Sequence, residues 1–291
     1  MNGRDTSPSA DVTRPPRWFL LLCLLLAGWL VTPPRELSAQ TSDFQAKAES
    51  AAEEEAHASA LGACLYGYPR AELWNRIQNE TRRVAEDQVI FAPVNRFYYF
   101  DRLARPGDGR FIEAPQNDTL YGSAYLDLSR GPVVLRIPPM EGRYYVALVV
   151  DAAGGVETRI SSQVTGPQGD VDLVFLGPDD KTEIPDGMRK LPQTANDLWV
   201  LMRVACAGGA DEKVAAGVLK KFTLSELSAV ATRRAEGRNT PVASQPLVAR
   251  AAPHQTLEFF QVLDQMLLRN PVPAEDRGLL ARWERLGLGA G

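Results

Sequence analysis

Apolar residues recur at helical spacing in the first regularly patterned part of the chain. Residues 42–84 are rich in Ala, and Leu61 and Leu65 lie four positions apart, which places them on one face of a helix. Gly67 followed by Pro69 predicts that this helix stops and restarts, because Pro lacks the backbone N–H that an interior helical position needs. An N-terminal helical segment with one break is therefore expected.

Short apolar runs separated by turn residues replace this pattern between residues 92 and 192. The stretch holds ten of the 21 Pro and eleven of the 23 Gly, which predicts closely spaced turns. No helical pattern separates the runs, so they favour an antiparallel β-sandwich over a parallel α/β sheet. The predicted strands are residues 120–128, 133–137, 143–152, 171–176 and 199–206.

Helical spacing returns after residue 207. We therefore predict an α+β protein in which residues 42–84 and 211–291 form helical segments on either side of a β-sandwich core at 90–206. The run 143–152 is apolar on both alternating faces, so it is expected to lie in the interior of its sheet. The expected C-terminal helices are residues 211–222, 224–234, 256–269 and 274–286, with a Pro-containing linker at 236–253.

An uncharged stretch at residues 18–31 follows Arg14 and Arg17 near the N-terminus. A helix of this length spans roughly 21 Å, short of the ~30 Å hydrocarbon core of a bilayer. A secretory signal peptide at residues 1–39, cut before Gln40, is therefore favoured, and the mature chain would be periplasmic or secreted. The alternative is an uncleaved helix that anchors the protein in the inner membrane, the one membrane contact expected.

The charge balance excludes one class of partner. The chain has 32 Lys and Arg against 36 Asp and Glu, a net charge of −4, and removal of residues 1–39 leaves 28 − 33 = −5. A protein that binds nucleic acid by neutralising phosphates needs the opposite sign, so no nucleic-acid partner is expected.

Two cysteines, Cys64 and Cys206, remain in the predicted mature chain. In an oxidising compartment they either form a disulfide bond or stay as two buried thiols, and their spacing does not decide between these alternatives.

The motifs of common catalytic centres are missing from the sequence. The two histidines, His57 and His254, are 197 positions apart, and no metal-binding spacing of His, Cys or carboxylates is present. Ser123 lies inside a predicted strand and not in a nucleophile elbow, and no Gly-rich phosphate loop follows any strand. No metal and no cofactor are therefore expected.

A group of polar residues surrounds the first long predicted strand. Tyr121, Ser123, Tyr125 and Asp127 share one face by alternation. Asn117 and Asp118 precede that strand in a predicted turn, where such side chains commonly cap backbone groups. The candidate ligand-binding residues are Asn117, Asp118, Tyr121, Tyr125, Arg143 and Arg203, with Asp118 and Tyr121 as catalytic candidates.

Arg203 shares a strand face with the apolar residues Trp199 and Leu201. A guanidinium in such surroundings needs a carboxylate partner, and Asp118 or Asp127 is expected to supply it. The alternatives are a structural ion pair and a preorganised guanidinium that recognises an anion.

The same region resembles the bacterial family called domain of unknown function 1254. The resemblance spans roughly residues 60–291 and is carried mainly by these runs: Tyr66-Gly67-Tyr68-Pro69, Asn95-Arg96-Phe97, Ala114-Pro115-Gln116-Asn117-Asp118-Thr119-Leu120-Tyr121, Gly142-Arg143-Tyr144-Tyr145 and Asn270-Pro271. It implies an Ig-like β-sandwich surrounded by helical elements, and it implies no established chemistry.

In longer members of that family a second domain, named domain of unknown function 1214, follows the helical connector, and this sequence lacks it. A separate protein partner that supplies this domain is one expectation. Two functions remain open: an exported protein that binds a small anionic ligand, and a periplasmic hydrolase or lyase acting on a small organic molecule. In the second, a tyrosine or Asp118 transfers a proton and Arg203 holds an anionic group.

Overall fold

The computed structural model describes residues 35–106, 115–230, 248–252 and 256–289, with side chains from residue 43 onward. The chain divides into two compact units, Met1–Ala58 and Ser59–Gly291. The uncharged stretch 18–31 and most of the predicted linker 236–253 lie outside the described residues. Among the helices that are described, none has the length and apolar character needed to cross a membrane.

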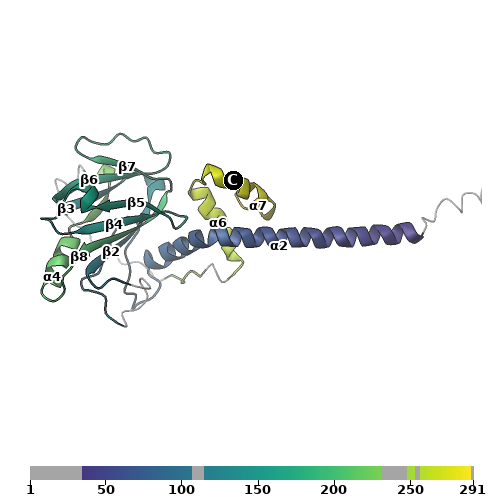
Figure 1. Ribbon diagram of the computed structural model, residues 1–291, viewed down its shortest axis with the longest axis horizontal. Helices are drawn as coiled ribbons and strands as arrows, with labels where there is room; N and C mark the ends of the chain where they lie inside the picture. Colours follow the sequence, from purple (N-terminus) through teal and green to yellow (C-terminus); the bar gives the residue numbers. More distant parts are fainter. Residues whose placement is uncertain (1–34, 107–114, 231–247, 253–255, 290–291) are drawn as a thin grey trace, which may run out of the picture. The chain divides into compact units, whose positions relative to one another are not determined.

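Helix α2 (Arg35–Glu80) is continuous, so the predicted break at Gly67 and Pro69 is wrong (Figure 1). Contacts within the helix and with a neighbouring turn accompany Pro69. Arg70 Nη1 donates to the carbonyl of Tyr66 at 3.0 Å, which adds a hydrogen bond in the turn that contains the proline. Gly67 faces Leu263 so closely that a Cβ at position 67 would lie 2.6 Å from Leu263 Cδ2.

Five antiparallel strands form the first sheet, in the order β1-β2-β8-β4-β5. β8 is central, and its register with β2 places Tyr121 opposite Arg203 and Asp127 opposite Asp197. β4 pairs with both β8 and β5, which confirms its predicted interior position. The strands are β1 (Tyr98–Tyr99), β2 (Thr119–Asp127), β4 (Tyr145–Val150), β5 (Val156–Ser161) and β8 (Asp197–Ala205).

Four strands form the second sheet, in the order β7-β6-β3-β9. β6 and β7 run parallel, and the other pairs are antiparallel. The helix predicted from residue 224 is wrong at its start, because Leu224 is buried and pairs with Leu135 of β3. The strands are β3 (Val133–Pro139), β6 (Gly169–Leu176), β7 (Arg189–Pro192) and β9 (Thr223–Glu226).

Residues of both sheets share one hydrophobic core. Tyr145 and Met202 from the first sheet and Leu135 and Phe175 from the second belong to the same buried cluster, each with no more than a trace of exposed surface. The chain is therefore a mixed α+β protein with two sheets of mainly antiparallel strands, as predicted.

The helices that follow the sheets complete this core. α2 packs against the C-terminal helices: the rings of Tyr66 and Trp283 are 5.2 Å apart, and Tyr66 Oη donates to Asp276 Oδ2 at 2.9 Å. Figure 1 shows α6 and α7 beside α2. The remaining elements are η1 (Leu128–Arg130), α3 (Ser162–Thr165), α4 (Asp211–Leu219), α6 (Glu258–Arg269), η3 (Ala274–Asp276), α7 (Arg277–Trp283) and η4 (Glu284–Leu286).

Candidate functional site

The predicted site residues do not form one cluster. Asn117 and Asp118 are exposed, in the turn before β2. The carbonyl of Asp118 accepts a hydrogen bond from the backbone amide of Cys206 at 2.8 Å, which continues the pairing of β2 with β8. The backbone of this turn therefore has the structural role that its residue types indicate.

Tyr121 and Arg203 meet across the paired strands β2 and β8. Arg203 Cζ lies 5.4 Å from the centre of the Tyr121 ring, a cation–π distance, and Arg203 Nη1 donates to Gln116 Oε1 at 3.4 Å. Tyr121 Oη accepts from the Gln116 backbone amide at 2.8 Å. The expected pairing of Arg203 with Asp127 is wrong, because the register places Asp127 six positions along β2 from Tyr121, roughly 20 Å away.

Tyr125 belongs to a second polar group, at the end of α2. Its Oη donates to Glu80 Oε2 at 2.8 Å, and Arg76 Nη1 lies 3.6 Å from Glu80 Oε1. The Tyr125 ring stacks on Trp199, with 6.3 Å between the ring centres. Burial raises the pKa of Glu80, and burial together with the neighbouring Glu80 carboxylate raises the pKa of Tyr125 well above its usual range.

Arg143 has a structural role in the described contacts. Its Nη1 and Nη2 bind the two carboxylate oxygens of Asp211 at 2.8 and 2.7 Å, and Nη1 also donates to the carbonyl of Ala205. These bonds join the start of α4 to the end of β8. The hydrogen bonds from Arg143 lower the pKa of Asp211 to about 2.

Cys64 and Cys206 are both free thiols, so the disulfide alternative is wrong. Cys64 lies half-buried on α2, whereas Cys206 is buried and directly follows the last residue of β8.

The larger of two described cavities lies between α2, α6 and the ends of β2 and β8. It encloses about 560 Å³, within the range of small-molecule sites. Trp74, Ile77, Val94 and Met266 are among its apolar residues. Its other lining residues are Gln78, Thr81, Arg82, Pro93, Tyr125, Leu126, Asp127, Arg130, Asp197, Gln265 and Arg269. Of the predicted site residues, Tyr125 lines it.

Asp197 is the buried carboxylate of this cavity, at 4% exposure. Arg269 Nη2 and Nε bind its two oxygens at 2.6 and 2.9 Å, and Asn270 Nδ2 donates to Oδ2 at 2.9 Å. Arg269 Nη2 also contacts Asp127 Oδ1 at 3.1 Å, and hydrogen bonding to Asp197 raises the pKa of Arg269. The charge of Asp197 is thus compensated within the protein.

Sequence reasoning missed Asp197, Arg269, Arg130 and Arg82 as parts of a site. Asp127 was placed on the polar face of β2, and Asn270 was noted in the family pattern, but neither observation reveals the cavity. Because the lining residues come from α2, β2, β8 and α6, only their packing brings them together.

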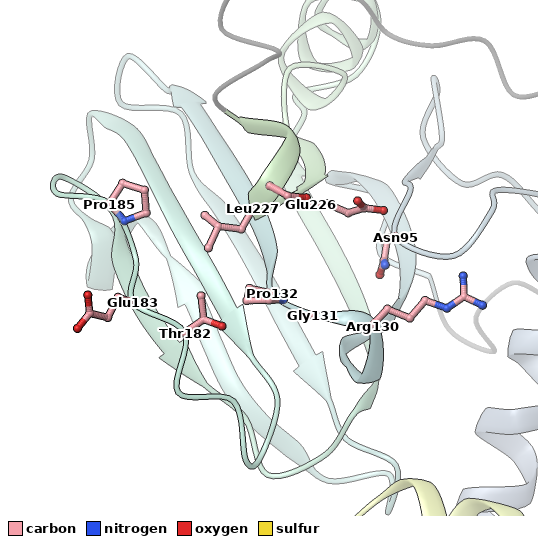
Figure 2. Close-up of a pocket in the computed structure, with 10 residues that line it drawn as sticks. Asn95, Arg130, Gly131, Pro132, Thr182, Glu183, Pro185, Glu226 and Leu227 are labelled. Carbon is pink, nitrogen blue, oxygen red and sulfur yellow. The ribbon is translucent and has the colours of Figure 1, made fainter.

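A smaller cavity of about 460 Å³ lies beside η1 and β9 (Figure 2). Its lining residues are Asn95, Arg130, Gly131, Pro132, Thr182, Glu183, Pro185, Glu226, Leu227 and Ser228. Neither of these two cavities is lined by Tyr121 or Arg203. Within the described part of the chain, no group of three or more His, Cys, Asp or Glu side chains is placed to hold a metal ion.

Comparison with known proteins supports the predicted resemblance. The model of a family described as "Protein of unknown function (DUF1254)" matches residues 94–226, a narrower range than the resemblance suggested. This range contains β1 to β9, so the match confirms that the two sheets carry the family pattern. No curated protein matches the sequence.

Two crystal structures are similar to the chain. The VPA0106 protein from Vibrio parahaemolyticus is 20% identical with a TM-score of 0.55, over 78% of this chain and 50% of that protein. A Burkholderia cenocepacia protein is 16% identical with a TM-score of 0.31, over 79% of this chain and 58% of that one. The chain thus spans about half the length of the Vibrio protein, and the first likeness shows a shared fold alone.

Proposed function

We propose that this is an exported protein that binds a small anionic ligand in the larger cavity. The supporting observation is that three guanidinium groups and two carboxylates line this space. Arg269 is bound to the buried Asp197. Arg130 contacts Asp127 Oδ2 at 3.4 Å and Arg82 donates to Gln78 Oε1 at 2.6 Å, but Arg130 keeps 84% of its side chain exposed and Arg82 is also exposed. Arg82 and Arg130 are therefore the groups that meet an incoming anion.

Guanidinium groups suit this role because their planar fork binds a carboxylate or phosphate through two parallel hydrogen bonds. Trp74, Ile77 and Met266 supply apolar walls for the rest of the ligand. Part of the cavity lining is therefore cationic and part is apolar. A ligand with a carboxylate and an apolar body fits such a lining.

The test is calorimetric titration of the purified protein with acetate, succinate and benzoate. Arg82→Gln and Arg130→Gln are each expected to weaken binding about tenfold or more, because a hydrogen bond to a charged group contributes ~1.5–3 kcal/mol. Arg159→Gln, an exposed change on β5 that lines neither described cavity, serves as the matched control. Absence of binding by all three anions, or equal affinity in all variants, overturns the proposal.

Export is the second part of the proposal, supported by the length and flanks of the uncharged stretch 18–31. The protein recovered from the periplasm is expected to begin at Gln40, as read by mass spectrometry of its N-terminal peptide. A membrane-bound chain that retains residues 1–39 would support the anchor and contradict cleavage.

We also propose that the two sheets form an Ig-like sandwich. Residues of both sheets share one core, and all but one of the strand pairs are antiparallel. An experimental structure in which the two sheets do not face each other would contradict this arrangement.

The hydrogen-bonded pair Tyr125 and Glu80 favours the alternative function, a hydrolase or lyase. A largely buried carboxyl group with a raised pKa, hydrogen-bonded to a tyrosine that lines the cavity, suits proton transfer. If a bound ligand is turned over, Tyr125→Phe is expected to lower the turnover rate without weakening binding. A ligand recovered unchanged after prolonged incubation contradicts the enzyme.

A further inference from the structure

The two described cavities adjoin. Arg130 lines both, and the consecutive residues Val94 and Asn95 line the larger and the smaller one respectively. On either side of η1 along the chain, Asp127 lines the larger cavity, and Gly131 and Pro132 line the smaller one. One strip of chain, η1 with its flanking residues, therefore borders the two spaces.

The two cavities differ in charge. Three arginines and two aspartates line the larger cavity, whereas one arginine, Arg130, and two glutamates, Glu183 and Glu226, line the smaller one. Figure 2 shows the Glu226 side chain directed toward Asn95, and the Arg130 guanidinium pointing away from Thr182 and Leu227. The smaller cavity is therefore bordered by the aliphatic part of the Arg130 side chain. Its other charged side chains, Glu183 and Glu226, are carboxylates.

The boundary between the cavities is fixed by backbone geometry. Asn95 has a φ of 61°, in the left-handed region, and it is held there by two bonds: its amide donates to the Tyr125 carbonyl at 2.8 Å, and its Oδ1 accepts from the Asp127 amide at 3.0 Å. Gly131 adopts φ 123° and ψ 177° after η1, a conformation that only Gly takes readily. The two spaces are therefore held side by side before a ligand binds.

From these observations we propose that the ligand is an extended zwitterion of the size of a short peptide. Its carboxylate binds at Arg82 and Arg130 in the larger cavity, and its ammonium group binds at Glu226 in the smaller one. Pro132, Pro185 and Leu227 provide apolar contacts near the ammonium end. This inference rests on the proposed function and adds the chemical class of the ligand.

The experiment compares three probes by calorimetric titration: tetra-alanine with free termini, its C-terminal amide, and its N-acetyl form. Each blocked end is expected to weaken binding about tenfold. Arg82→Gln is expected to weaken the free peptide but to have little further effect on the amide. Glu226→Gln is expected to weaken binding of the free peptide but not of the N-acetyl form.

Glu284→Gln, an exposed change in η4, is the matched control for the carboxylate variant and is expected to bind all probes as the unmodified protein does. If the N-acetyl peptide or succinate binds as tightly as the free peptide, the inference is overturned while anion binding stands. If no anionic probe binds, the proposed function is overturned as well.

Discussion

At the scale of single residues, Glu80 combines a charge with an unfavourable position. It is the last residue of α2, where the helix dipole disfavours a negative charge, and its side chain is only 18% exposed. The bonds from Tyr125 and Arg76 offset part of the cost of burial, yet burial remains the largest influence and raises the pKa of Glu80. The folded state therefore holds its proton more tightly than the unfolded state.

This gives a prediction for pH-dependent stability. Tighter proton binding by Glu80 stabilises the folded state. This stabilisation is fully present below the unfolded pKa of Glu80, about 4.3, and is lost as the pH rises through its higher folded pKa. Glu80→Gln keeps an acceptor for Tyr125 and removes the titration. The variant is expected to unfold at a higher temperature than the unmodified protein at pH 7, with the gap closing toward pH 4 in calorimetric scans.

Glu72→Gln is the control, because Glu72 lies on the same helix, also neighbours Arg76 and is more exposed, at 36%. A stability gap for Glu80→Gln that stays constant between pH 4 and pH 8, or that matches the control, contradicts the prediction.

At the scale of elements, α2 and α6 approach each other closely at Gly67, two residues before Pro69. We predict that Gly67→Ala destabilises the fold by about 1–3 kcal/mol despite the better helix propensity of Ala, because its Cβ would overlap fully buried Leu263. The measurement is urea unfolding.

Leu263→Ala alone should cost about 2–5 kcal/mol, since it opens a space in the core. The double variant is expected to lose less than the sum, because the new methyl group enters that space. Additive losses would show that Gly67 is not required by this contact.

At the scale of the whole molecule, Arg269 joins α6 to both β2 and β8 through Asp127 and Asp197. Arg269→Gln leaves the buried Asp197 carboxylate with only the Asn270 side chain among its described side-chain partners. We expect a loss of about 2 kcal/mol in urea unfolding, less than the ~3–5 kcal/mol of a fully buried pair because Arg269 is partly exposed.

Arg130→Gln provides the comparison, because Arg130 also contacts Asp127 but is exposed, and its removal should change stability by less than about 0.5 kcal/mol. Equal losses in the two variants would contradict the structural role assigned to Arg269 and would also make Arg130→Gln unsuitable as a binding variant.

The sequence by itself determined the elements whose pattern is local. Short apolar runs between turn residues located β2, β3, β4, β6 and β8, and helical spacing located α4 and α6, because both patterns depend only on the conformation of each segment. It also placed Tyr121 and Tyr125 on one face of a strand, and it identified the family pattern.

Tertiary structure decided the rest, for one physical reason: these features depend on contacts between residues far apart in the chain. Leu224 forms a strand because β3 offers it a partner, and α2 continues through Pro69 at a point where α6 and the turn after β4 lie close to the helix. The pairing of Asp197 with Arg269 and the cavities that share Arg130 arise in the same way, from segments up to 195 residues apart, such as Trp74 and Arg269. The local sequence pattern of a segment does not specify which distant segment it will pair or pack with.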